Sequence, residues 1–137
     1  MLKRIILIAG GALLLVAALY LAMLLDTNSL MRYMRSVFNG EVPLEETAGR
    51  PEDMYNPLFY FDDPQVTFEL RRVFVLHNFS DGYVWIRYSR VIQSPEFDPT
   101  SENPDYDLLS STGSTPSLWR IHKDEDGWHI VDIEERP

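Results

Sequence analysis

The chain contains no cysteine, and that absence removes several structural and catalytic options together. With Cys 0 in 137 residues, the fold has no disulfide bond, no zinc site built on thiolates and no cysteine nucleophile. The sequence also lacks a glycine-rich phosphate loop, a G-x-S-x-G nucleophile motif and an H-E-x-x-H zinc motif. We therefore expect no catalytic residue, no cofactor and no metal site.

Positive charge is scarce after the first few residues. The chain beyond Leu25 holds all 21 acidic residues but only 10 of the 12 basic ones, so its net charge is about −11. Nucleic acid and anionic lipid headgroups both attract positive protein surfaces. This part of the chain is therefore not expected to bind nucleic acid, and its acidic surface favours solubility or a basic protein partner.

Residues 5–25 form an apolar run of 21 residues without a charge. At about 1.5 Å per residue, such a helix crosses the roughly 30 Å hydrocarbon core of a bilayer. The alternative is a cleaved signal peptide, whose apolar stretch is only about 7–15 residues and ends in a small-x-small cleavage site. Residues 21–25 provide no good pair of small residues. We predict an uncleaved transmembrane anchor over residues 1–26.

Charges flank this run on both sides, so they give little orientation signal. Lys3 and Arg4 precede it, and Arg32 and Arg35 follow within ten residues. A short tail stays in the cytoplasm easily, whereas a long domain crosses the membrane largely regardless of its charge. We predict a single-pass protein of the cell membrane, with its N-terminus in the cytoplasm and residues 27–137 outside.

Helical spacing follows the anchor and then gives way to proline. Ser29 is a plausible N-cap, and Asn39 and Gly40 end the pattern. The apolar residues at helical spacing are Leu30, Met31, Met34, Val37 and Phe38. Residues 41–64 carry four prolines, so we predict a loop that packs back on the domain, with one helical turn beginning at Pro51.

Two hairpins complete the predicted fold. The predicted strands are residues 66–79, 83–92, 118–123 and 128–134, with turns at 80–82 and 124–127 that each contain Asp and Gly. In the first strand, Val73 and Val75 share the face opposite Phe68 and Leu70, which predicts a bulge near Arg71. In the second strand, Val84 and Ile86 share one face, and Tyr83 and Trp85 share the other. We predict an α+β fold: an N-terminal transmembrane helix followed by a four-stranded antiparallel sheet packed on a short helix.

The end of the chain, SLWRIHKDEDGWHIVDIEE (residues 117–135), resembles the closing hairpin of the nuclear transport factor 2-like superfamily, also called cystatin-like in its broad α+β form. Members often end with a Trp-bearing strand, an Asp-Gly turn and a strand reading Trp-x-Ile-Val-Asp-Ile, and small membrane-anchored bacterial proteins of unassigned role often look like this. The resemblance implies a curved sheet around a helix, with a pocket at the open end. Members similar to ketosteroid isomerase place an Asp or Tyr acid–base pair there. This chain has one short helix in place of their two longer ones, which argues against a closed cone and an enzyme pocket.

Three clusters could carry chemistry. Counting outward from the second turn pairs His122 with His129, but a metal site needs a further ligand, so we interpret them as a solvated histidine pair. The turn at 124–127 resembles part of a calcium loop, yet His122 and Ile133 occupy its first and last ligand positions, so it is a turn. Asp132 and Glu134 have the spacing of paired carboxylates, and equally that of a solvated strand.

The predicted loop 93–116 is acidic and has no Lys or Arg. Its acidic residues, with Trp85, are our candidate partner-binding residues: Glu96, Asp98, Glu102, Asp105 and Asp107. The aromatic residues Tyr83, Trp85, Trp119 and Trp128 are interpreted as sheet packing.

Two functions remain open at this point. We predict a membrane-anchored, non-enzymatic domain that binds a protein or a cell-envelope component. The alternative is a small-ligand-binding or enzymatic domain with a pocket between sheet and helix. A pocket of several hundred Å³ with a buried carboxylate would favour the alternative, whereas a filled core with an exposed aromatic or acidic face would favour the first.

Overall fold

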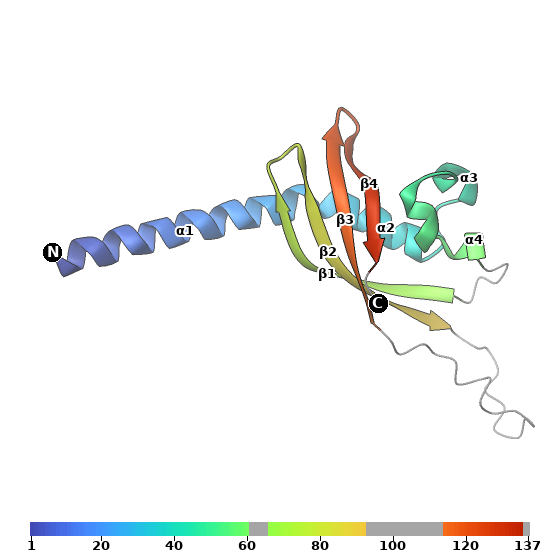
Figure 1. Cartoon of the computed structure of the whole chain (residues 1–137), viewed down its shortest axis with the longest axis horizontal. Helices are drawn as coiled ribbons and strands as arrows, with labels where there is room; N and C mark the ends of the chain where they lie inside the picture. The colour runs from blue at the N-terminus through green and yellow to red at the C-terminus, as the bar shows by residue number, and fades with distance from the viewer. Residues whose placement is uncertain (61–65, 93–113, 136–137) are drawn as a thin grey trace, which may run out of the picture.

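One long helix leads into a small α+β domain (Figure 1). The computed structural model describes residues 1–60, 66–92 and 114–135. The helices are α1 (Leu2–Asp26), α2 (Asn28–Phe38), α3 (Leu44–Thr47), the 3-10 helix η1 (Pro51–Tyr55) and α4 (Pro57–Tyr60). The strands are β1 (Val66–His77), β2 (Asp81–Ile92), β3 (Thr115–Asp124) and β4 (Gly127–Glu135), in one antiparallel sheet of order β1-β2-β3-β4. The predicted α+β class is confirmed.

Helix α1 is long and apolar enough to cross a membrane. The candidate span, Lys3–Asp26, has 24 residues, which at about 1.5 Å each exceeds the roughly 30 Å of a hydrocarbon core. The described side chains before Tyr20 are all exposed, whereas Tyr20, Met23 and Leu24 pack against the core of the domain. The last turns of α1 therefore belong to both the apolar helix and the domain.

Helix α2 supplies the helical side of the core. All five of its predicted apolar residues are buried, which confirms that face. The helix begins at Asn28, one residue before the predicted cap Ser29, because Thr27 is the single residue between α1 and α2. The buried Thr27 hydroxyl donates to the carbonyl of Met23 at 3.0 Å, so it closes the end of α1 rather than capping α2 with its side chain.

The first hairpin turns two residues earlier than predicted. The turn is formed by residues 78–80, and the Asn78 side chain accepts hydrogen bonds from the backbone N–H groups of Ser80 at 3.0 Å and of Asp81, the first residue of β2, at 2.7 Å. Gly82 lies inside β2, opposite His77, where a Cβ atom would come within 2.3 Å of the His77 Cβ. The glycine is therefore needed for a close approach between strands and does not form the turn itself.

A bulge shapes β1. Its register with β2 shifts between Arg72 and Phe74, which confirms the bulge predicted near Arg71. The predicted common face of Val73 and Val75 is wrong, because Val73 is 56% exposed whereas Val75 is fully buried. The extra residue reverses the alternation, so that Val75 joins the core to which Phe68 and Leu70 belong.

The second hairpin and η1 close the core. Lys123 pairs with Trp128 across it, as predicted. Trp119 is fully buried and its indole Nε1 donates to the Tyr55 hydroxyl at 2.9 Å, which also bonds the Ser117 hydroxyl at 2.6 Å. Because Tyr55 belongs to η1, these bonds fix the proline-rich segment on the sheet. Pro51 is the first residue of η1, as predicted.

Polar side chains of the sheet hold the end of α1. The carboxylate of Asp26 accepts from Lys123 Nζ at 2.8 Å and from Trp128 Nε1 at 2.9 Å. The Arg72 guanidinium donates to the carbonyl of Leu24 at 3.0 Å and to the hydroxyl of Thr27 at 2.8 Å. The domain is thus fastened to α1 by hydrogen bonds as well as by packing.

Candidate functional site

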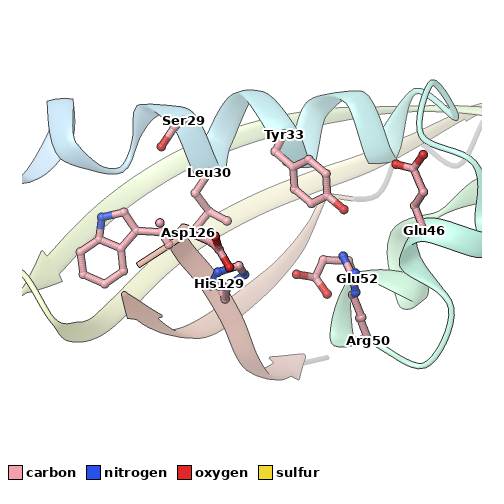
Figure 2. Close-up of a pocket in the computed structure, with 10 residues that line it drawn as sticks. Ser29, Leu30, Tyr33, Glu46, Arg50, Glu52, Asp126 and His129 are labelled. Atoms are coloured by element: carbon pink, nitrogen blue, oxygen red, sulfur yellow. The ribbon is translucent and has the colours of Figure 1, made fainter. Parts of the chain in front are cut away.

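A cleft of about 430 Å³ lies between α2, the segment of short helices and the β3–β4 turn. Tyr33 comes from α2, Glu52 from η1, and Arg50 from the position directly before η1. Asp126 and His129 come from the second hairpin. Figure 2 shows these side chains arranged around a common space, with the carboxylate of Glu52 directed into it. The cleft has the size of a small-ligand site.

Glu52 is the buried carboxylate of this cleft. Its side chain is only 4% exposed, and its Oε2 atom has no hydrogen-bond partner among the described residues. Burial raises the pKa of the Glu52 carboxyl above its usual range, and the nearby Asp53 charge adds to the rise, while Arg50 and His129 oppose it. A buried, unsatisfied carboxyl is costly, so it marks a position where a ligand could supply the missing partner.

The local sequence explains why Glu52 is held there. Pro51 begins η1, where its fixed φ suits a helical turn. Tyr55, at the end of the same turn, is fixed in the core by its two hydrogen bonds. The backbone N–H of Arg50 donates to Asp53 Oδ2 at 3.2 Å, so the turn is closed by a local bond at its start and tied to the core at its end.

Tyr33 is electrostatically linked to Glu52. Burial raises the pKa of the Tyr33 hydroxyl, the Glu52 charge raises it further, and Arg50 lowers it. The hydroxyl therefore stays protonated at neutral pH and can donate a hydrogen bond into the cleft. Figure 2 shows the Tyr33 ring and the Arg50 side chain converging on the space beside Glu52.

The charge at the rim of the cleft is acidic. Glu46 and Asp126 line it together with Glu52, and Arg50 is the one Lys or Arg among the described lining residues. His129 also lines it, and its Nε2 atom bonds Asp124 Oδ1 at 3.0 Å. The cleft therefore presents more negative than positive groups to a ligand.

The two histidines pair across the hairpin, as predicted, and each also bonds an aspartate. His122 lies opposite His129, which confirms the register. Each imidazole nevertheless has its own carboxylate: His122 Nδ1 bonds Asp81 Oδ1 at 2.7 Å, and His129 bonds Asp124. Both imidazoles are about half exposed, which fits the interpretation as a solvated histidine pair; the sequence did not predict that an aspartate from the start of β2 and one from the end of β3 would each bond one ring.

Of the predicted partner-binding residues, only Trp85 belongs to the described part of the chain, and it does not line this cleft. Glu96, Asp98, Glu102, Asp105 and Asp107 lie outside the described residues, so their role stays a prediction. Trp85 is described and is 40% exposed. Its neighbours Val84 and Ile86 point into the core, so Trp85 lies on the sheet face turned away from α2.

The four aromatic residues predicted to pack on the sheet fall into two groups by their burial. Trp119 and Trp128 are buried, which confirms their interpretation as sheet packing. Tyr83 is 44% exposed and Trp85 40%, so these two pack on each other on the outer face of the sheet and are not part of the core. Both distinguishing features set out above are therefore present: a cleft with a buried carboxylate, and an exposed aromatic face.

Sequence reasoning missed Glu52, Tyr33 and Arg50. The available signal was the acidic residue directly after Pro51, inside an aromatic-rich segment that had to pack on the domain. Treating residues 41–64 as a loop hid it, because a single helical turn has no periodicity from which burial can be read.

Comparisons with protein-family models, with curated proteins and with solved structures found no match to this chain.

Proposed function

We propose that this chain is a single-pass membrane protein whose outward domain binds a partner protein by accepting one of its basic side chains in the cleft. Residues 1–26 form the anchor, with the N-terminus in the cytoplasm, and residues 27–137 form the binding domain. The observation that carries the proposal is the buried Glu52 carboxyl with an unpartnered Oε2 atom.

The physical argument begins with the cost of that carboxyl. An ionised carboxylate removed from water loses several kcal/mol of hydration, of which only good pairing returns a substantial part. A Lys or Arg side chain entering the cleft would give Oε2 a charged donor and would favour the ionised form. The volume of about 430 Å³ accommodates such a side chain.

The charge of the domain favours the same class of partner. The chain after Leu25 carries about −11, and such a field raises the association rate of basic proteins. Glu46 and Asp126 at the rim extend this field to the cleft. The acidic residues at 96–107 would add to it, as the sequence predicts.

A second candidate is a small-ligand-binding or enzymatic domain that uses the same cleft. A carboxyl with a raised pKa beside a tyrosine is the kind of group that acid–base chemistry employs. Under this alternative a free small molecule fills the cleft and no protein partner is needed. The resemblance to the nuclear transport factor 2-like superfamily stays a prediction under either function.

Binding of a probe to the full chain in lipid nanodiscs tests the proposal. The probe is a lysine-rich peptide, compared with its acetylated, uncharged form and with free butylamine. We expect the lysine peptide to bind the wild-type protein and Glu52→Gln to weaken binding at least tenfold, which is about 1.4 kcal/mol. Glu125→Gln is the matched control, because it removes the same charge from an exposed position in the β3–β4 turn that does not line the cleft.

Equal weakening by the two substitutions would show that only the general charge attracts the peptide, and would contradict the role of Glu52. Butylamine binding as tightly as the peptide, with loss in Glu52→Gln, would favour the small-ligand alternative.

A further inference from the structure

The end of α1 and the first strand enclose an apolar crevice of about 410 Å³. Val16, Leu19, Tyr20 and Met23 line it from the helix, and Phe74 and Leu76 line it from β1. The rings of Tyr20 and Phe74 stack with centroids 5.4 Å apart. Side chains of the sheet therefore lie beside a stretch of helix that belongs to the apolar run of residues 5–25.

The position of this contact along α1 indicates how deep in the bilayer the contact lies. Tyr20 precedes Leu25 by five residues, which is about 7.5 Å along a helix. For comparison, an amphipathic helix that lies in a membrane interface buries its apolar face about 5–10 Å into the boundary between headgroups and acyl chains. If the apolar run spans the bilayer, Phe74, which stacks on Tyr20, is at that depth.

The apolar surface continues from β1 onto β2. Phe74 pairs with Trp85 and Leu76 with Tyr83 across the two strands. These four side chains, here called the aromatic patch, are 40–50% exposed. The Phe74 and Trp85 rings lie 5.5 Å apart, and those of Tyr83 and Trp85 lie 6.3 Å apart. Tyr and Trp are the residues that gather at membrane interfaces, because each has an apolar ring and a polar tip.

The same sheet face becomes charged with distance from α1. On β3, Leu118 and Arg120 continue the rows of Trp85 and Tyr83, and on β4 the next positions are Glu134 and Asp132. Figure 1 shows β1 and β4 at opposite edges of the sheet, and β1 is the strand whose side chains line the crevice beside α1. The gradient from aromatic to charged residues therefore runs away from the apolar helix.

We propose that the aromatic patch lies in the lipid interface of the bilayer that α1 crosses, so that the domain rests on the membrane through β1 and β2. This inference depends on the proposed anchoring and does not depend on what the cleft binds. The patch is uncharged, so an anionic membrane does not repel it as it repels the acidic remainder of the domain. The hydrogen bonds of Asp26 and Arg72 fix the sheet relative to α1 and hold the patch at this height.

The backbone of β1 limits how deeply the domain enters. Strand β1 is at the edge of the sheet, and the unpaired amides and carbonyls of an edge need water. The strand therefore lies among hydrated headgroups, and only its side chains reach the acyl region.

Spin labels on the full chain in phosphatidylcholine nanodiscs, one chain per disc, test this position. The absence of native cysteine allows single-cysteine variants to be labelled without further changes. Tyr83→Cys reports on the patch, Asp132→Cys on the same sheet face at β4, and Leu14→Cys on the apolar helix. Power saturation compares the access of oxygen, which concentrates in lipid, with that of a water-soluble nickel chelate.

We expect oxygen access to dominate strongly at Leu14→Cys and moderately at Tyr83→Cys, and nickel access to dominate at Asp132→Cys. If the labels at Tyr83→Cys and Asp132→Cys are equally aqueous while Leu14→Cys is in lipid, the inference is wrong and the anchoring stands; the patch would then be left for a protein. An aqueous label at Leu14→Cys would overturn the anchoring and the inference together.

An independent readout uses the native tryptophans. Lipids brominated near the top of the acyl chain quench fluorescence at short range. Quenching of the wild-type chain should exceed that of Trp85→Phe, a change at a 40% exposed position that leaves the core intact. Equal quenching of both proteins would contradict contact between Trp85 and lipid.

Discussion

Replacing Trp119 with alanine should remove a large part of the stability of the domain. Trp119 is fully buried and stands at the centre of the aromatic core, with Phe38 at 6.4 Å and Tyr55 at 5.7 Å between ring centroids. Truncation of a buried Trp costs about 3–5 kcal/mol, because its contacts are lost and a cavity remains. The lost hydrogen bond adds little, since the Tyr55 hydroxyl keeps Ser117 as a partner.

Trp85→Ala is the matched control. It deletes the same side chain from the same sheet, but at a position that is 40% exposed, where we expect a loss below about 1 kcal/mol. Both variants are made in the full chain, because α1 contributes Tyr20, Met23 and Asp26 to the packing of the domain.

Urea unfolding in nanodiscs, followed by near-ultraviolet circular dichroism, measures the difference. A loss of about 4 kcal/mol lowers the urea midpoint by more than about 1 M for the usual slopes of 1–3 kcal/mol/M. A loss below about 1 kcal/mol for Trp119→Ala would refute the described core, since no fully buried indole could be removed so cheaply.

Three further predictions concern titration and the junction. The pKa of Tyr55 is raised to about 12, against about 10 in the unfolded chain. The contribution of its protonated hydroxyl to the free energy of unfolding is therefore complete below about pH 10 and is lost as pH rises toward 12. Urea midpoints across this range should fall less steeply with pH in Tyr55→Phe than in the wild-type protein. The pKa of Glu52 is also raised by burial, so ionisation of this carboxyl destabilises the fold as pH rises through that pKa. Glu52→Gln should therefore raise the free energy of unfolding at neutral pH, and this gain should vanish near pH 4. A lower free energy of unfolding in Glu52→Gln at neutral pH would contradict the account. Arg72→Met should cost about 1.5–3 kcal/mol by removing charged hydrogen bonds to Leu24, Thr27 and Asn28, and should speed trypsin cleavage at Arg32, while unchanged cleavage would contradict a fastening role.

Periodicity was a reliable guide where elements were long. The helical spacing of α2 and the alternation of β2 follow directly from which residues contact the core, so both could be predicted from the sequence. The bulge in β1 was also predictable, because a change of apolar phase requires an extra residue. The resulting exposure of Val73 was not, since the sequence does not show which residue is extra.

Long-range contacts set the limit for the candidate site. Glu52 is buried because Tyr55, three residues later, bonds Ser117 and Trp119 more than sixty positions away. The exposure of the aromatic patch also depends on long-range packing. Alternation places Trp85 and Trp119 on opposite faces of the sheet, but it does not show which of the two faces is buried. Which face meets α2 depends on the three-dimensional packing of the helix on the sheet.

The ionisation of Glu52 with and without a bound lysine peptide is the most direct test of the proposed function. The full chain in nanodiscs, labelled with carbon-13 at its glutamate carboxyls, is titrated by nuclear magnetic resonance, and Glu52→Gln assigns the signal. The account predicts that the pKa of Glu52 is above the usual range without peptide and falls when the peptide binds, while the signal of Glu125 changes little. A Glu52 signal that titrates normally, or that does not respond to a bound peptide, would contradict the proposal that this carboxyl receives the basic group.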